Sequence, residues 1–163
     1  MNAKDVIKKS LKTTGDMLTM FVADLSDEDL IVRPAPAANH IAWQLGHLIA
    51  CEAMMGGVIP GATYPELPAH LKSQMDGKSS KAPPPGGYLK KTEYVDWFNQ
   101  VRGATIANVD RLSDADLDKA TPADYATWAP TVGDLLVLTA NHTLMHAGQF
   151  SVVRRALNKP VLF

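Results

Sequence analysis

The chain is short of cysteine and of excess charge, and both shortages exclude classes of protein. Its single cysteine cannot form an internal disulfide framework, which fits a reducing compartment. It has 16 Lys and Arg against 17 Asp and Glu, a formal net charge of −1. Nucleic-acid binding proteins usually carry a basic excess, so we expect no nucleic-acid partner.

The sequence also lacks a long apolar run. The N-terminal MNAKDVIKKS mixes charged and apolar residues and has no signal-peptide core. The most apolar stretch, IAWQLGHLIACEAMM, is interrupted by Gln, His and Glu and is too short to cross a bilayer. We therefore expect no membrane partner and a cytoplasmic protein, and the length of 163 residues predicts a single domain over residues 1–163.

Strand-like alternation is absent, whereas four segments repeat apolar residues every three or four positions, which predicts helices. They cover about residues 3–25, 39–56, 92–112 and 131–157. Asn39 is a good N-cap for the second, and Thr131 and Asp134 have capping-box spacing at the start of the fourth. The predicted fold class is all-α, a four-helix bundle.

Two features concern the connections. The segment Gly57–Lys91 is dense in Pro, Gly and Ser, and predicts a long crossover between the second and third helices, a lid or a partly disordered excursion. LSDEDL at 25–30 recurs as LSDADL at 112–117, and each copy has helix-starting spacing between Ser and Asp. The repeat indicates either two helix pairs related by pseudo-symmetry or convergence on a common cap.

Three histidines are the candidate metal ligands. His142 and His146 are four residues apart, so they share one helix face at about 6 Å along the axis. Their spacing with neighbouring apolar residues directs them inward, and His47 lies on the inward stripe of the second helix. Three histidines with an open fourth position are typical of catalytic zinc, but inward histidines can also be core residues paired with a carbonyl or carboxylate. HExxH and Glu-x-x-His are both absent, which argues against a zinc protease and a ferritin-like di-iron site.

Four further residues are candidates near this site. Gln149 follows His146 on the predicted seam and could orient a ligand, or make a packing hydrogen bond. Cys51 is one turn after His47 and could be a fourth ligand, although a buried core thiol is more common. His40 is expected at the surface or in a cap, with a substrate-facing role as the alternative. Arg154 could bind a substrate carboxylate or simply suit a helix C-terminus.

The run H-x-x-x-H-x-G-Q with the following Arg-Arg and Lys-Pro resembles the DinB/YfiT-like superfamily, as do NHIAWQLGHLI and LSDEDL…RP. The resemblance implies a four-helix bundle with a long crossover and one divalent metal, usually zinc or nickel. Carried over by position, the ligands are His47, His142 and His146. Many relatives have a basic residue where this chain has Ala147.

The same resemblance implies a metal-dependent enzyme acting on a small molecule. Some relatives are thiol-dependent transferases or isomerases that use low-molecular-weight thiols such as bacillithiol or mycothiol, so S-transfer is the first expectation. Metal-dependent hydrolysis needs the same ligands, and a non-catalytic metal-binding stress-response protein is the third possibility. Relatives also commonly form homodimers through a helix pair.

Overall fold

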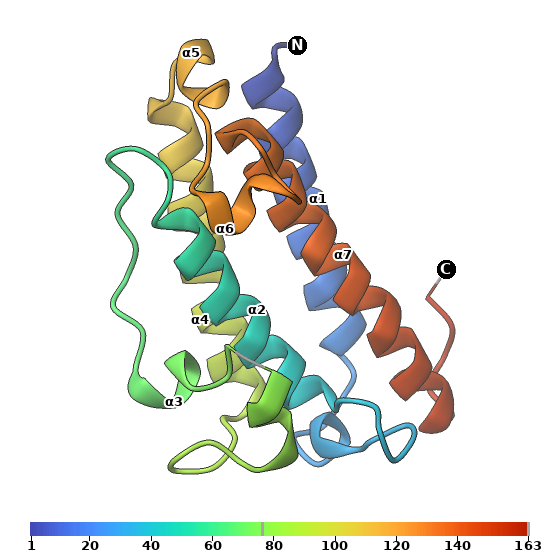
Figure 1. Ribbon diagram of the computed structural model, residues 1–163. Helices are drawn as coiled ribbons and strands as arrows, with labels where there is room; N and C mark the ends of the chain where they lie inside the picture. The colour runs from blue at the N-terminus through green and yellow to red at the C-terminus, as the bar shows by residue number, and fades with distance from the viewer. Residues whose placement is uncertain (76, 163) are drawn as a thin grey trace.

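The computed structural model describes residues 1–75 and 77–162, and four long helices form its body (Figure 1). These helices are α1 (Ala3–Val22), α2 (Ile41–Gly56), α4 (Lys91–Arg111) and α7 (Val132–Ala156). Within the described residues there is no strand, only an isolated bridge between Ala120 and Thr131. The predicted all-α four-helix bundle is therefore confirmed. None of the described helices combines the length and apolar character needed to cross a membrane.

Side-chain caps mark the starts of α2 and α7. The Thr131 hydroxyl accepts a hydrogen bond from the backbone N–H of Asp134, and the Asp134 carboxylate accepts one from the N–H of Thr131, so the predicted capping box is confirmed. The prediction that Asn39 caps the second helix is wrong. His40 is the cap of α2, and its Nδ1 accepts from the N–H of Trp43 at 3.1 Å.

The order of the helices around the bundle differs from the order along the chain. α1 packs against α4 and α7, and α2 packs against the same two helices, so α1 and α2 occupy opposite corners. In Figure 1, α1 and α7 run downward while α2 and α4 run upward. Because the neighbouring α2 and α4 run in the same direction, the chain must return along the whole bundle between them.

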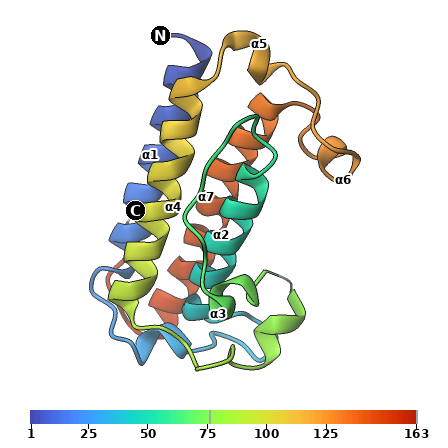
Figure 2. The ribbon, with the colours of Figure 1, turned by 90° about the vertical axis from the view of Figure 1, so that its left-hand side faces the viewer.

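That return is the crossover between α2 and α4, of which residues 57–75 and 77–90 are described. It descends on the outside of the bundle in both views and contains α3 (Ala69–Lys72) and the 3-10 helix η2 (Gly77–Lys81) (Figures 1 and 2). Tyr64 donates to the Thr105 hydroxyl at 3.1 Å, and the Trp43 indole donates to Ser79 at 2.8 Å. The segment is thus a crossover that is hydrogen-bonded to α4 and α2.

The repeated LSD sequences each begin a short helix, as predicted. Ser26 and Asp29 exchange hydrogen bonds of 2.9 and 3.1 Å at the start of the 3-10 helix η1 (Asp29–Ile31). Ser113 and Asp116 do the same at 2.8 and 3.2 Å at the start of α5 (Asp114–Leu117). The one remaining short helix of the described chain, α6 (Ala123–Ala126), follows and leads into α7.

A buried ion pair lies inside the bundle. Arg102 of α4 binds Glu52 of α2 in a two-pronged contact, with both N–O distances 2.8 Å, and the two side chains are only 5% and 4% exposed. Arg102 also donates to the backbone carbonyl of Leu11 in α1 and to the hydroxyl of Thr143 in α7, the latter at 2.7 Å. Thr105 donates to Glu52 at 2.7 Å. One guanidinium therefore joins all four long helices, which the sequence analysis did not predict.

Candidate metal centre

The structure brings the three predicted histidines together on facing sides of α2 and α7. Each of the three rings has one nitrogen that faces the group, and these three nitrogens, from His47, His142 and His146, lie within 4.8 Å of one another. The Nε2 atoms of His142 and His146 are 3.2 Å apart. Within the described chain, no other His, Cys, Asp or Glu joins this group.

The His47 ring is held from two sides. Its face stacks on Trp43, with ring centroids 4.8 Å apart, and its Nδ1 is 3.2 Å from the backbone carbonyl oxygen of Gln74. A carbonyl oxygen only accepts hydrogen bonds, so Nδ1 carries the proton and Nε2 of the neutral ring keeps its lone pair. The crossover therefore fixes which nitrogen of His47 is available to a ligand.

His146 has a side-chain partner on the opposite helix. Its Nδ1 lies 2.7 Å from Oε1 of Gln44, which is one turn before His47 in α2. Gln44 is not among the site residues predicted from the sequence. The available signal was its place, as a glutamine in the otherwise apolar run that contains His47.

Burial keeps these imidazoles neutral. It lowers the pKa of His146 to about 3 and that of His142 to about 4, and the neighbouring histidines add to both effects. Burial also lowers the pKa of His47, against the opposing effect of the Gln74 and Met75 carbonyls. Neutral imidazoles present lone pairs, so no proton has to leave these rings before a cation binds at neutral pH.

This donor set fits a small divalent metal. Zinc binds histidine nitrogen at about 2.0–2.1 Å in tetrahedral geometry, which places two such nitrogens about 3.3 Å apart. The observed 3.2 Å between Nε2 of His142 and Nε2 of His146 agrees with that spacing. Three nitrogen donors suit zinc or nickel better than magnesium or calcium, which prefer oxygen.

Cys51 lies beside the group without completing it. Its Sγ is 3.6 Å from both ring nitrogens of His47. Burial raises the pKa of the thiol to about 11, so it is protonated at neutral pH. Sγ thus contacts the His47 ring itself, and a tetrahedral metal held by the three histidines alone would keep one coordination position open.

The other three candidates lie elsewhere. Gln149 is exposed rather than on the buried seam, where Phe150 takes the inward place, so its predicted inward position is wrong. His40 caps α2, which agrees with the expectation of a cap. It is only 3% exposed and its ring packs against Tyr88, with the ring centroids 4.6 Å apart, so the expectation of surface exposure is wrong.

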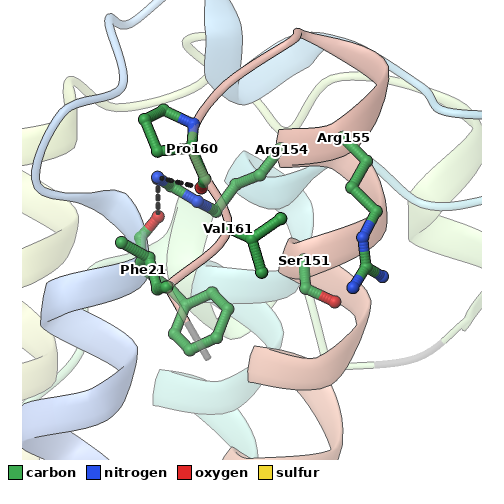
Figure 3. Close-up of a pocket in the computed structure, with 7 residues that line it drawn as sticks. Phe21, Ser151, Arg154, Arg155, Pro160 and Val161 are labelled. Atoms are coloured by element: carbon green, nitrogen blue, oxygen red, sulfur yellow. Dashed lines mark hydrogen bonds between the residues drawn. The ribbon is translucent and has the colours of Figure 1, made fainter.

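Arg154 is 2% exposed and already paired with a carboxylate of this chain, because its guanidinium binds Asp24 and the backbone carbonyls of Phe21 and Pro160. Figure 3 shows the two carbonyl contacts in a cavity of about 120 Å³ near the C-terminal end of α7. Eight residues separate Arg154 from His146, about 12 Å along the helix. The substrate-binding alternative for Arg154 is therefore wrong, because its guanidinium connects α7 to the C-terminal turn of α1 and to Asp24.

The missing side chain of Gly46 leaves room for the side chain of Gln74, whose backbone carbonyl contacts His47. A Cβ on Gly46 would lie 1.6 Å from Oε1 of Gln74, whose side chain is buried. We expect Gly46→Ala to displace Gln74 and lower the free energy of unfolding by about 1–3 kcal/mol, measured by urea denaturation.

Gly148→Ala is the matched control, because a Cβ there meets nothing within 4 Å. It should raise the free energy of unfolding by up to about 1 kcal/mol through helix propensity. Equal effects of the two alanines would contradict the proposed clash.

Comparison with known families gives one match that covers most of the chain. The model of the DinB superfamily matches residues 10–150. The chain belongs to the DinB superfamily. A search of the curated proteins finds no match.

Solved structures show the same DinB fold at low sequence identity. A conserved protein from Enterococcus faecalis is 13% identical, with 98% of this chain and 99% of that chain aligned at a TM-score of 0.67. YfiT from Bacillus subtilis is 17% identical, with 96% and 89% aligned at a TM-score of 0.64. YfiT is described as a probable metal-dependent hydrolase with an unusual four-helix bundle topology.

Proposed function

We propose that this DinB protein is a divalent-metal-dependent enzyme in which His47, His142 and His146 hold the metal. The observation that supports this most is the close group of three ring nitrogens, within 4.8 Å of one another, from two facing helices. His47 and His146 each have one hydrogen-bond partner at Nδ1, as a core histidine would, but the three rings also contact one another. That arrangement favours a shared ligand.

An enzyme is a better explanation than a purely structural metal. Structural zinc sites are closed by four protein ligands, and the described residues supply three. A divalent metal held here supplies Lewis acidity, which lowers the pKa of a water or thiol in the open position. The chain's own residues hold the ligands neutral and oriented. Burial raises the pKa of the Cys51 thiol, so the proposal places the nucleophile in the open position and not on Cys51.

For the reaction we propose hydrolysis first, because YfiT, which shares the fold, is described as a probable metal-dependent hydrolase. Thiol S-transfer is the second candidate, because the two histidine motifs resemble a superfamily that includes thiol-dependent transferases. Both reactions place a nucleophile in the same open position, so the protein ligands do not separate them. The difference lies in whether turnover needs an added thiol.

The first test is elemental analysis of protein purified without a His-tag. We expect near-stoichiometric zinc or nickel in the parent, and its loss in His47→Ala and in His142→Ala/His146→Ala. His70→Gln is the matched control, because His70 lies in α3 outside the group and should leave the metal content unchanged. No metal in the parent, even after incubation with zinc and nickel, would overturn the proposal.

The metal-loaded protein would then be assayed with ester, amide and phosphoester substrates, and separately with an electrophile plus a low-molecular-weight thiol. Turnover without thiol that disappears in His47→Ala supports hydrolysis. Turnover only with thiol supports S-transfer. Stoichiometric metal without turnover in either assay would favour the non-catalytic alternative.

A further inference from the structure

We propose that Gln44 is a positioning residue that holds His146 with Nε2 directed at the metal. This inference rests on the proposed function and adds a residue to it. The side chain of Gln44 is 1% exposed, and its Oε1 lies 2.7 Å from Nδ1 of His146 across the interface between α2 and α7. No ligand role is assigned to Gln44 itself.

The orientation of the Gln44 amide follows from its second partner. The Nε2 of Gln44 is 2.8 Å from the backbone carbonyl oxygen of Asn39. That carbonyl can only accept a hydrogen bond, so the nitrogen of the amide faces Asn39 and the oxygen faces His146. The amide oxygen is also only an acceptor, which means that Nδ1 of His146 donates. The proton is therefore on Nδ1, and Nε2 of the neutral ring has a free lone pair.

The rest of the ring environment shows what this tautomer does. Nε2 of His146 lies 3.2 Å from Nε2 of His142, so the lone pair points into the group of three. His47 has the same arrangement, with Nδ1 on the carbonyl of Gln74. Carbonyl-type oxygens from two different segments thus hold two of the rings by Nδ1 and leave Nε2 of both rings free to bind a metal.

Gln44 also limits the motion of the ring. Without an acceptor, the buried Nδ1–H of His146 would have no partner, which favours rotation of the ring or a shift of the proton to Nε2. Either change removes the Nε2 lone pair from the site. Loss of partners that orient a metal-binding histidine commonly lowers metal affinity by about 10- to 100-fold.

The experiment combines a metal-free and a metal-dependent measurement. In the metal-free parent, ¹⁵N-detected NMR of the histidine rings at pH 7.5 should show His146 protonated on Nδ1 and unprotonated on Nε2. Zinc affinity is then measured by competition with a chromophoric chelator. We expect Gln44→Leu to bind zinc about 10- to 100-fold more weakly than the parent.

Two further variants separate positioning from packing. Gln44→Glu keeps an oxygen acceptor for Nδ1 and should bind zinc at least about tenfold more tightly than Gln44→Leu. Gln149→Leu, at the exposed glutamine on α7, should bind zinc like the parent. Equal zinc affinities of Gln44→Leu and Gln44→Glu would overturn the inference, because a packing role alone does not distinguish an acceptor from an apolar group.

The NMR measurement keeps this inference distinct from the proposed function. A His146 ring protonated on Nε2 in the parent overturns the role of Gln44 even if zinc binds stoichiometrically. A parent that binds neither zinc nor nickel overturns both the metal centre and the role of Gln44 in it. The NMR spectrum then reports only whether the hydrogen bond exists.

Discussion

Arg102→Met is expected to lower the free energy of unfolding by about 3–5 kcal/mol, because it leaves the Glu52 carboxylate buried without its counter-ion. The substitution also removes the donors to Leu11 of α1 and Thr143 of α7. The loss should appear as a lower midpoint in urea denaturation followed by circular dichroism, with the slope unchanged.

Two companion variants test the reason for that loss. Glu52→Gln/Arg102→Met removes the stranded charge and should be more stable than Arg102→Met alone. Lys12→Met breaks an ion pair with Asp16 whose side chains are 71% and 66% exposed, and it should leave the midpoint unchanged. If Arg102→Met is no less stable than Lys12→Met, the buried pair does not hold the bundle together.

The second large effect is a loss of stability of the metal-free protein in mild acid. Burial lowers the pKa of His40 to about 4 and that of His146 to about 3, whereas an unfolded histidine has its ordinary value of 6.5. Below pH 6.5 these histidines bind protons in the unfolded chain but stay neutral in the folded chain. The free energy of unfolding is therefore highest above pH 6.5 and decreases as the pH falls toward 4. Each such histidine contributes a slope of about 1.4 kcal/mol per pH unit.

His40→Asn isolates one of these contributions. Asparagine can still cap α2 but does not titrate, so the slope of unfolding free energy between pH 6 and 4.5 should decrease by about 1.4 kcal/mol per pH unit. The measurement is a series of urea titrations across that range with a chelator present. An unchanged slope would mean that His40 is protonated in the folded protein.

The sequence predicts the long helices well because their signals are local. Apolar residues repeat with the helical period, and Thr131 and Asp134 form their box within one turn of chain. The start of α2 is harder, since Asn39 and His40 can both cap a helix. In the structure His40 is the cap, and its ring packs against Tyr88 of the crossover, with the ring centroids 4.6 Å apart.

The site was predictable for its histidines but not for the residues that hold them. Gln44, His47 and Glu52 are the three polar interruptions of the most apolar run, and only His47 was predicted to have a role in the site. In the structure Gln44 meets His146 and Glu52 meets Arg102. Such pairings join segments at least 50 residues apart, and no local pattern encodes them.

The error at Gln149 has a simple geometric origin. After an inward residue on a helix, the next inward residue follows three or four positions later. After His146 these positions hold Gln149 and Phe150, and the bundle buries Phe150 completely. The phenylalanine takes the core position because its burial removes more apolar surface from water than burial of the glutamine would.

The separation of the ligands along the chain has a consequence for biosynthesis. His47 lies in α2, while His142 and His146 lie in α7, the last helix of the described chain. A nascent polypeptide that lacks α7 therefore offers one of the three proposed ligands, and an incomplete chain cannot capture the metal with all three. When α7 docks beside α2, a metal held by all three histidines would connect these two helices and oppose their separation.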